Sequence, residues 1–273
     1  KFADSFCGWA LSLKSDEVQV EEIFEIIENM YRFGGTGIPK GGCKGVIDAL
    51  EAVIFANGGK IHTEQEVSKI LIDNGKAAGV IVEGKKYEAD IVISNLGHAA
   101  TALLCGEALS READAGYLKM LETLKPSAGI KICLAADEPL VGHAGVLLTP
   151  YTRRINGVNE VTQADPRLAP PGKHLTMSHQ YVAPEDVKNL ESEIEMGLAD
   201  LKEIFPGKRY EVLLIQSYHD EWPVNRAASG TDPGNKTPFS GLYVVGDGAK
   251  GKGGIEVEGV ALGVASVMGK ILS

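Results

Sequence analysis

A glycine-rich segment near the end of the chain has the residue types and spacing of a ligand-binding loop. The apolar run Leu242–Val245 leads into Gly246-Asp247-Gly248, and further glycines follow up to the apolar helical pattern of Val257–Leu272. A glycine backbone can approach a ligand closely, and the unpaired N–H groups at a helix N-terminus favour an anion or a polarised carbonyl. Asp247 is suited to accept hydrogen bonds from a sugar-alcohol hydroxyl. The segment therefore predicts a strand, a ligand-binding loop and a helix.

Composition argues against two other kinds of site. The chain has 37 acidic and 27 basic residues, a net charge of −10, whereas binding to nucleic acid phosphates needs a basic face. Its six histidines form no HxxxH or HExxH pattern and its four cysteines no CxxC pair, so a metal site has no support. The widely spaced cysteines favour a reduced, cytoplasmic compartment.

No apolar stretch approaches the roughly 18–20 residues that cross a bilayer, although peripheral membrane contact stays compatible with the sequence. His98, His179 and His219 are candidate proton handlers by residue type alone, and a structural role is the simpler interpretation of each. Tyr218 and Trp222 are candidates either for a substrate cavity or for the core.

Elements that could position the loop are recognisable along the chain. Residues 1–13 have the pattern of an amphipathic helix already in progress, and a second helix is predicted after Ser15-Asp16-Glu17. Turn residues and β-branched runs then predict a small antiparallel meander with strands at Lys60–Thr63, Val67–Ile72 and Gly79–Val82. Tyr87–Ser94 is predicted to be a strand buried on both faces.

The middle of the chain changes from helical to sheet-forming patterns. Residues 98–123 are helical in pattern, and 128–181 contain strand-like runs separated by Pro and Gly clusters. A charged amphipathic helix is predicted at Pro184–Phe205 and a strand at Tyr210–Ser217. The polar segment 222–238, rich in Pro, Gly and Asn, is predicted to be a loop.

Four motifs together resemble the phytoene-desaturase and amine-oxidase superfamily. Gly241–Gly248 and its helix resemble that family's C-terminal flavin motif, and Ile38–Gly42 followed by a helix resembles its PxGG turn. Thr63–Ile70 resembles the strand that holds the adenine, and Ala89–Asn95 resembles the ADxVxSN strand. The motifs occur in the family's order and cover nearly the whole chain.

The resemblance implies FAD as cofactor and a set of residues that contact it. Val67 would hold the adenine through its backbone, and Asp247, between Gly246 and Gly248, would bind on the ribityl side. Ser94 and Asn95 would line the edge of FAD, although Asn95 could instead cap a helix. Ile255, Glu256 and Val257 would lie near the flavin ring. The acidic side chains Glu256 and Glu258 would compete with a ligand anion there, so we expect this helix end to face the ring edge.

The resemblance also implies an enzyme that transfers two electrons between FAD and an organic substrate, which accounts for the lack of a nucleophile–base triad. Desaturation of a hydrophobic polyisoprenoid is the leading reaction. An amine oxidase or a polyene isomerase are alternatives on the same fold. A non-catalytic protein that escorts prenyl groups is an alternative from another class, against which the retained Gly246-Asp247-Gly248 argues.

The predicted fold is α/β: a partial FAD-binding doubly wound domain (36–97 and 237–273) interleaved with a sheet-and-helix substrate domain (1–35 and 98–236). The strand and GxGxxG turn that open the family's fold and bind the FAD pyrophosphate are not found before the predicted elements, and the GxGxxG spacing of Gly246–Gly251 belongs to the C-terminal motif. We therefore expect an N-terminal segment of the same protein, roughly 150 residues long, to act as a partner of this chain. Without it, FAD binding is expected to be weak. The Lys250-Gly251-Lys252 sequence also differs from better-known members.

Overall fold

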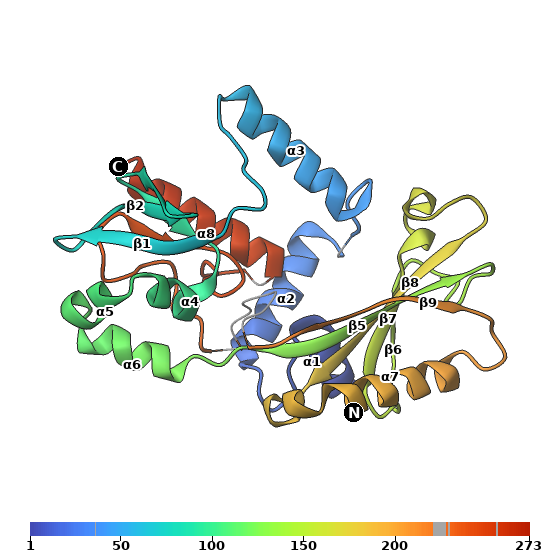
Figure 1. The fold of residues 1–273 in the computed structure, drawn as a ribbon. Helices are drawn as coiled ribbons and strands as arrows, with labels where there is room; N and C mark the ends of the chain where they lie inside the picture. The colour runs from blue at the N-terminus through green and yellow to red at the C-terminus, as the bar shows by residue number, and fades with distance from the viewer. Residues whose placement is uncertain (36, 221–227, 229, 255) are drawn as a thin grey trace. The chain divides into compact units, whose positions relative to one another are not determined.

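The computed structural model describes residues 1–273 except 36, 221–227, 229 and 255 (Figure 1). The chain forms two compact units, each made of three stretches of sequence. Unit 1 comprises Lys1–Val18, Met30–Ile61 and Ala128–His219; unit 2 comprises Gln19–Asn29, His62–Ser127 and Asp220–Ser273.

These boundaries differ from the sequence-based ones, because 37–61 belongs with unit 1 and 19–29, 98–127 and the described residues of 220–236 belong with unit 2. For 98–127 the physical reason is that Cys105 and Ala108 pack in one core with Ile70, Phe239 and Leu242. The assignment of FAD and substrate to the two parts stays a prediction.

Unit 1 is built on a five-stranded antiparallel sheet in the order β6-β7-β8-β5-β9. Its strands are β5 (Ala128–Ala136), β6 (Val146–Leu148), β7 (Ile155–Glu160), β8 (His174–Val182) and β9 (Glu211–Tyr218). Short 3₁₀ turns lie at Val161–Gln163, Pro166–Leu168 and Pro184–Asn189. The predicted strands of 128–181 and 210–217 are therefore present, each within a few residues of its expected bounds.

Helix α7 (Leu190–Ile204) covers one face of this sheet (Figure 1). Side chains alternate between faces along a strand, and Ile130, Ile132 and Leu134 of β5 all point into a core that also contains Leu201 of α7. These four residues have no exposed surface. Helix α1 (Phe2–Leu11) contacts β7. Its Trp9 indole N–H donates a hydrogen bond to Asn159 Oδ1 at 2.8 Å.

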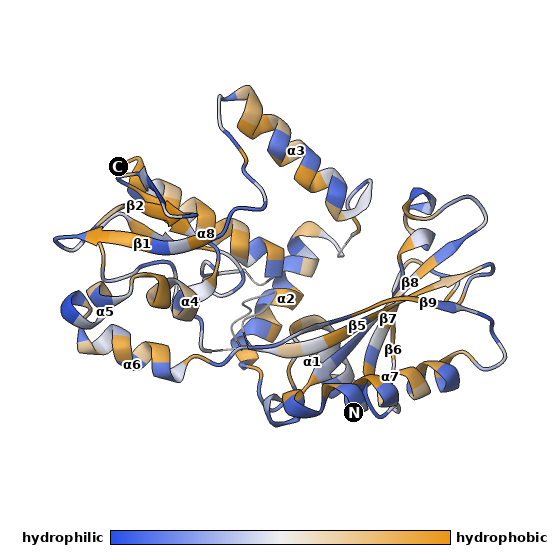
Figure 2. Cartoon of the chain, viewed as in Figure 1, coloured by the Kyte–Doolittle hydropathy of each residue, from blue (hydrophilic) through white to orange (hydrophobic). Residues whose placement is uncertain are grey.

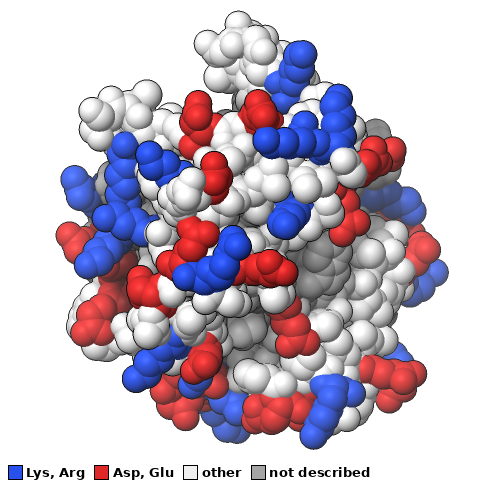
Figure 3. Space-filling view, turned by 60° about the vertical axis from the view of Figure 1, so that its left-hand side comes forward, with Lys and Arg blue, Asp and Glu red and all other residues white. Residues whose placement is uncertain are grey.

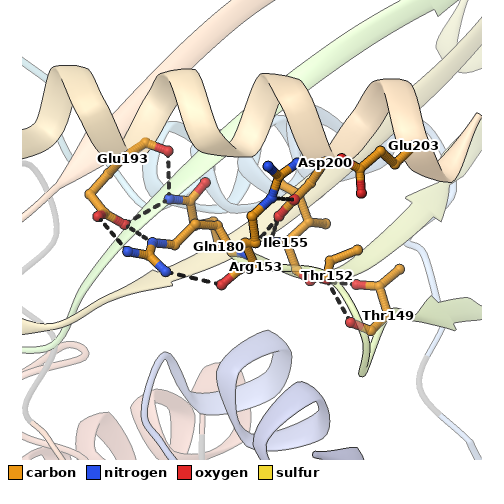
Figure 4. Close-up of polar contacts among 9 residues, drawn as sticks. Thr149, Thr152, Arg153, Ile155, Gln180, Glu193, Asp200 and Glu203 are labelled. Carbon is orange, nitrogen blue, oxygen red and sulfur yellow. Dashed lines mark hydrogen bonds and ion pairs between the residues drawn. The ribbon is translucent and has the colours of Figure 1, made fainter.

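Buried carboxylates of α7 bind the turn before β7 (Figure 4). Asp200 accepts hydrogen bonds from the Arg153 side chain at 2.9 Å and from the Arg154 and Ile155 backbone N–H groups. Glu193 accepts two from the Arg154 guanidinium. Burial raises the pKa of Asp200, but these donors outweigh it and hold that pKa below its usual value. The network fixes α7 to the sheet.

Helices α2 (Val20–Phe33) and α3 (Gly42–Ala56) confirm the helices predicted after Ser15-Asp16-Glu17 and after the Ile38–Gly42 turn. Among their described residues none is buried, and most of their apolar side chains are exposed. Figure 2 shows apolar residues along both helices. The turn before α3 is held within unit 1, because the Gly41 N–H donates to Asp165 Oδ2 at 3.1 Å.

Unit 2 contains a three-stranded antiparallel meander and a two-stranded parallel sheet. The meander consists of β1 (Val67–Asp73), β2 (Lys76–Val82) and β3 (Lys85–Glu88); the parallel pair is β4 (Val92–Ser94) and β10 (Leu242–Val244). The helices are α4 (Gly97–Leu104), α5 (Glu107–Glu112), α6 (Ala115–Thr123) and α8 (Glu256–Ile271).

Two strand predictions in this region were wrong. Lys60–Thr63 is not a strand. Tyr87–Ser94 is not a single strand buried on both faces, because β3 pairs with β2 and the chain then turns into β4. Ile91 and Ile93 are 41% and 45% exposed, so the apolar run does not correspond to a fully buried strand.

Within the described residues, none of the helices is long and apolar enough to cross a membrane. Acidic and basic side chains are interspersed over the face seen in Figure 3. That face therefore presents no continuous basic patch of the kind that binds nucleic acid.

Candidate functional site

The carboxyl ends of β4 and β10 bring together residues that are far apart in the sequence. Val244 pairs with Ser94 in parallel register, and the Val245 N–H donates to the Ser94 carbonyl at 2.9 Å. Asn95 and Gly246 therefore leave neighbouring strands at the same edge. In open α/β sheets, ligands bind at this edge.

Gly246 allows Asn95 to lie against the loop that follows β10. Its φ is 102°, which side chains rarely adopt, and a Cβ at this position would overlap Asn95 Oδ1. The structure therefore brings together Asn95 and Gly246, two of the residues predicted from the sequence to contact FAD.

Ser94 has a structural partner on the next helix. Its hydroxyl is buried and lies 2.7 Å from Thr101 Oγ1 of α4. The residue that caps α4 is Leu96, with no side-chain hydrogen bond, so the alternative role of Asn95 as the helix cap is wrong.

Asp247 lies in a half-buried charge cluster with Lys250 and Asp232. Lys250 Nζ donates to the Asp247 carbonyl at 3.0 Å and lies 3.4 Å from Asp232 Oδ2 and 4.0 Å from Asp247 Oδ1. The Lys250 N–H also donates to Asp232 Oδ2 at 2.9 Å. The side chains of Lys250, Asp232 and Asp247 are 14%, 24% and 22% exposed. Lys250, which departs from the better-known pattern, thus anchors the loop.

Asn235 is buried and its side chain holds the loop in place, a role that was not predicted from the sequence. Its Nδ2 donates to the carbonyl oxygens of Val244 at 3.0 Å and Ala249 at 2.6 Å, which brackets Gly246–Gly248. The available signal was its place in the turn-forming Asp232-Pro233-Gly234-Asn235, shortly before the strand.

Helix α8 packs against this loop through its glycines. The Gly251 N–H donates to the Gly259 carbonyl at 2.8 Å, and a Cβ at Gly263 would lie 2.9 Å from the Ala249 oxygen. Gly259 and Gly263 therefore allow α8 to approach closely, and the loop itself is their packing partner.

The other predicted cofactor residues are more scattered. Glu256 begins α8 and is half-buried, whereas Val257 is 82% exposed. Val67 is half-buried at the start of β1, in a different sheet from β4 and β10. Ile255 lies outside the described residues. Their contacts with FAD stay predictions.

His98 is a structural histidine in unit 2. Its Nε2 faces the Gly234 carbonyl oxygen at 2.8 Å, and its Nδ1 lies 3.0 Å from the Tyr117 hydroxyl. Burial lowers the pKa of His98 and so favours the neutral ring. It ties α4 to the segment that carries Asn235.

The groups at this edge have the chemistry that binds a flavin cofactor. Gly246 and Gly253, with φ values of 102° and 87°, lie at the two ends of the loop; Gly246 is buried against Asn95, whereas Gly253 is exposed and open space surrounds its Cβ direction. Asp247 places a carboxylate, an acceptor for hydroxyl groups, between them. These features fit the ribityl side of FAD and the start of α8 fits a polarised ring edge.

Comparison with known proteins identifies the family. The model of the flavin containing amine oxidoreductases matches residues 3–263, so the chain belongs to that family. This membership confirms the predicted resemblance and fold class, and it identifies FAD as the cofactor.

Three similar proteins are longer than this chain, which covers only part of each of them. A crystal structure of an oxidoreductase from Methanosarcina mazei is 88% identical, with a TM-score of 0.94 over 98% of this chain and 64% of that one. The uncharacterized protein MJ1488 of Methanocaldococcus jannaschii is 47% identical over 100% of this chain and 64% of its own length. A chloroplastic prolycopene isomerase 2 from an Oncidium hybrid cultivar is 30% identical over 79% of this chain and 43% of its own. The chain thus spans less than two thirds of these relatives.

Proposed function

We propose that the full-length protein is an FAD-dependent oxidoreductase that desaturates a hydrophobic polyisoprenoid substrate. The observation that carries this proposal is the edge shared by β4 and β10, where Asn95, Gly246 and Asp247 meet at a glycine-rich loop. Family membership supports the redox chemistry, and the prolycopene isomerase relative supports a polyene substrate.

In this proposal unit 2 supplies the cofactor contacts and unit 1 supplies substrate contacts. Asp247 accepts hydrogen bonds from ribityl hydroxyls, the glycine backbone of 246–254 lies along the cofactor, and Val67 holds the adenine through its backbone. FAD, when bound, accepts the electron pair that leaves the substrate. The pyrophosphate is held by the GxGxxG turn of an N-terminal segment, which completes the cofactor site.

The test uses the full-length protein with FAD and phytoene in liposomes of neutral phospholipid, under air and with a quinone as electron acceptor. The expected product has a longer conjugated chain, which is detected by chromatography and by a red-shifted absorbance. Co-sedimentation with the liposomes checks the accompanying proposal of peripheral membrane contact. A protein that retains FAD but leaves phytoene unchanged would contradict desaturation.

Polyene isomerisation is the second candidate, because the named plant relative is a prolycopene isomerase. Prolycopene replaces phytoene in the same assay, with FAD reduced before mixing. Conversion of prolycopene without any change in the number of double bonds would favour this activity. Oxidation of primary aliphatic amines, measured by peroxide release, would instead favour the amine-oxidase alternative, and a flavin-free full-length protein would favour the prenyl-binding escort.

A further inference from the structure

A short turn segment, 232–235, connects helix α4 with the glycine-rich loop, and all of these parts lie within unit 2. On one side, His98 of α4 is 1% exposed, and its Nε2 lies 2.8 Å from the Gly234 carbonyl oxygen. On the other side, Asn235 is 7% exposed and donates through Nδ2 to two carbonyl oxygens of the loop region. We call His98, Gly234 and Asn235 the α4–loop link.

The two ring contacts fix the tautomer of His98. A carbonyl oxygen only accepts, so Nε2 carries the proton that is donated to Gly234. Nδ1 lies 3.0 Å from the Tyr117 hydroxyl, which donates to the bare nitrogen. Burial lowers the pKa of His98 and keeps the ring neutral, although the Gly234 carbonyl and Asp232 act in the opposite direction. The neutral ring thus has one N–H donor, and the Gly234 carbonyl receives it.

Gly234 is the position of the link that most needs such a restraint. Its φ is 72° and no atom lies within 4 Å of its Cβ direction, so neighbouring side chains do not restrict it. Its N–H donates to Asp232 Oδ1 at 3.0 Å, but its carbonyl belongs to the next peptide unit. That unit is planar and includes the Asn235 nitrogen. The bond from His98 therefore selects one orientation for Asn235.

Asn235 contacts three parts of the proposed flavin site. Its carbonyl accepts from the Val244 N–H at 3.1 Å, and its Nδ2 donates to the Val244 carbonyl at 3.0 Å and the Ala249 carbonyl at 2.6 Å. A Cβ on Gly263 of α8 would lie 3.1 Å from this Nδ2, so the helix also approaches the amide closely. The strand before the loop, the loop itself and the helix after it thus all contact one residue.

We propose that His98 is a positioning residue for FAD: through Gly234 and Asn235 it holds the loop 246–253 in the shape that binds the cofactor. This inference rests on the proposed flavin site at that loop. His98 needs no contact with FAD, because its effect passes through the backbone. Without its donor, Gly234 gains other orientations, and only a fraction of the protein keeps the loop contacts. The apparent affinity for FAD then falls in proportion to that fraction.

The first test compares variants of the full-length protein by hydrogen exchange in the absence of FAD. His98→Leu removes the donor, whereas His98→Gln keeps an N–H donor for the Gly234 carbonyl. Amides of 244–251 should exchange about 5- to 100-fold faster in His98→Leu and within about threefold of wild type in His98→Gln, because a lost hydrogen bond permits local opening. Folded His98→Leu protein with unchanged exchange in 244–251 would overturn the proposal.

Tyr117→Phe is the matched control. It removes the hydroxyl group at Nδ1 of the same buried ring, but it leaves the Nε2 donor to Gly234 in place. Urea unfolding should show a loss of stability in both Tyr117→Phe and His98→Leu, whereas only His98→Leu should speed exchange in the loop. Equally fast loop exchange in the two variants would mean that His98 acts through general stability, and it would refute the positioning role.

The second test titrates the same full-length variants with FAD. The Kd should rise about 5- to 100-fold in His98→Leu and stay within about threefold of wild type in His98→Gln and Tyr117→Phe, because only the first variant loses the restraint on the loop. An unchanged Kd in His98→Leu would show that FAD binding does not depend on this restraint, and the proposal would then be wrong.

A measurement on the wild-type protein serves if His98→Leu does not fold. Linkage is reciprocal, so a hydrogen bond that favours FAD binding must itself be stabilised by bound FAD. NMR of full-length protein with ¹⁵N-labelled histidine follows solvent exchange of the His98 Nε2 proton, and His98→Gln assigns its signal. FAD should slow this exchange. Loop amides that FAD protects while the ring proton exchanges as before would contradict the link.

These outcomes separate the inference from the proposed function. If His98→Leu weakens FAD binding as expected but the full-length protein leaves phytoene and prolycopene unchanged, the assigned reaction is wrong and the positioning role stands. If phytoene is desaturated and FAD affinity does not depend on His98, the positioning role is wrong and the proposed function stands.

Discussion

In unit 1, strands and helix α7 enclose Ile130, Ile132 and Leu134 so that none of their surface is exposed. In unit 2, α8 carries Val257, Leu262 and Met268 with at least 38% of each exposed, and its described buried residues are Gly259, Gly263 and Val267. Apolar burial is the main stabilising contribution to a fold. The sheet and α7 of unit 1 therefore share a fully buried apolar core, whereas α8, which follows the candidate flavin loop, buries little apolar surface.

The acidic residues of the two units also differ in how deeply they are buried. Asp200 and Glu193 in unit 1 are buried and paired with arginines, so they fix a helix to a sheet. Lys250, Asp232 and Asp247 in unit 2 stay partly exposed beside a glycine-rich loop. The carboxylates of unit 1 therefore have a structural role, whereas those of unit 2 lie beside the candidate ligand site.

The largest expected effect is the difference in FAD affinity between the 273-residue chain and the full-length protein. The 273-residue chain should bind FAD with a Kd above about 1 μM, which corresponds to roughly −8 kcal/mol. The full-length protein should bind at least about 100-fold more tightly, because two charge-assisted pyrophosphate hydrogen bonds contribute about 3–6 kcal/mol. Isothermal titration of both proteins measures the difference. Equal affinities would show that unit 2 needs no completing segment.

The next effect is on the stability of unit 1. Asp200→Ala should lower the free energy of unfolding by about 2–4 kcal/mol, because it leaves two backbone N–H groups without their acceptor and removes a hydrogen bond from the half-exposed Arg153. Glu203→Ala is the control: it removes an exposed partner of the same Arg153 and should cost at most about 1 kcal/mol. Urea unfolding followed by circular dichroism compares them.

The pKa of Asp200 adds a pH dependence to that comparison. Its folded pKa lies below the unfolded value of about 3.9, so its stabilisation is complete above that pH. The stabilisation is lost as the pH falls further, through the folded pKa. The difference between wild type and Asp200→Ala should therefore shrink in strong acid, and a constant difference would contradict the assigned pKa direction.

A smaller effect is expected at the loop of unit 2. Gly246→Ala should destabilise the loop by about 1–3 kcal/mol, since φ is positive and the new Cβ overlaps Asn95. Gly253→Ala is matched, with a similar φ but open space around it. Thermal unfolding and FAD content of the full-length variants should show Gly246→Ala as the more damaging. Equal damage would mean that the approach of Asn95 is unimportant.

The smallest effect is on a single cofactor contact. Asp247→Ala in the full-length protein should weaken FAD binding three- to twelvefold, since a hydrogen bond to a neutral hydroxyl contributes about 0.5–1.5 kcal/mol. Asp90→Ala, which removes an exposed carboxylate just before β4, should leave the affinity unchanged. Unchanged FAD retention in Asp247→Ala would reject the assigned contact.

The loop at Gly246 could be predicted from the sequence, because the positive φ that it requires favours glycine. A glycine with positive φ after an apolar strand is a local signal. The turn signal at Asn235 did not reveal its partners, nor did any pattern at Lys250, because those partners are fixed only once β10 and the loop are folded.

The failed strand at Tyr87–Ser94 has a similar cause. An apolar run gives the tendency to form a strand, but not its partner or the turn that divides it. β3 ends where its antiparallel pairing with β2 ends, and β4 begins where the parallel pairing with β10 begins. That second pairing joins residues too distant in the sequence for any local pattern to report.

The parallel pairing of β4 with β10 also has a consequence for synthesis on the ribosome. Ser94 emerges about 150 residues before its partner Val244, an interval of roughly 8–30 s at typical elongation rates. The continuous stretch Ala128–His219, which contains every strand of the unit 1 sheet, is complete before β10 emerges. The nascent chain can thus form that sheet while the edge of β4 waits uncovered, and a chaperone that binds apolar strands has its longest opportunity there.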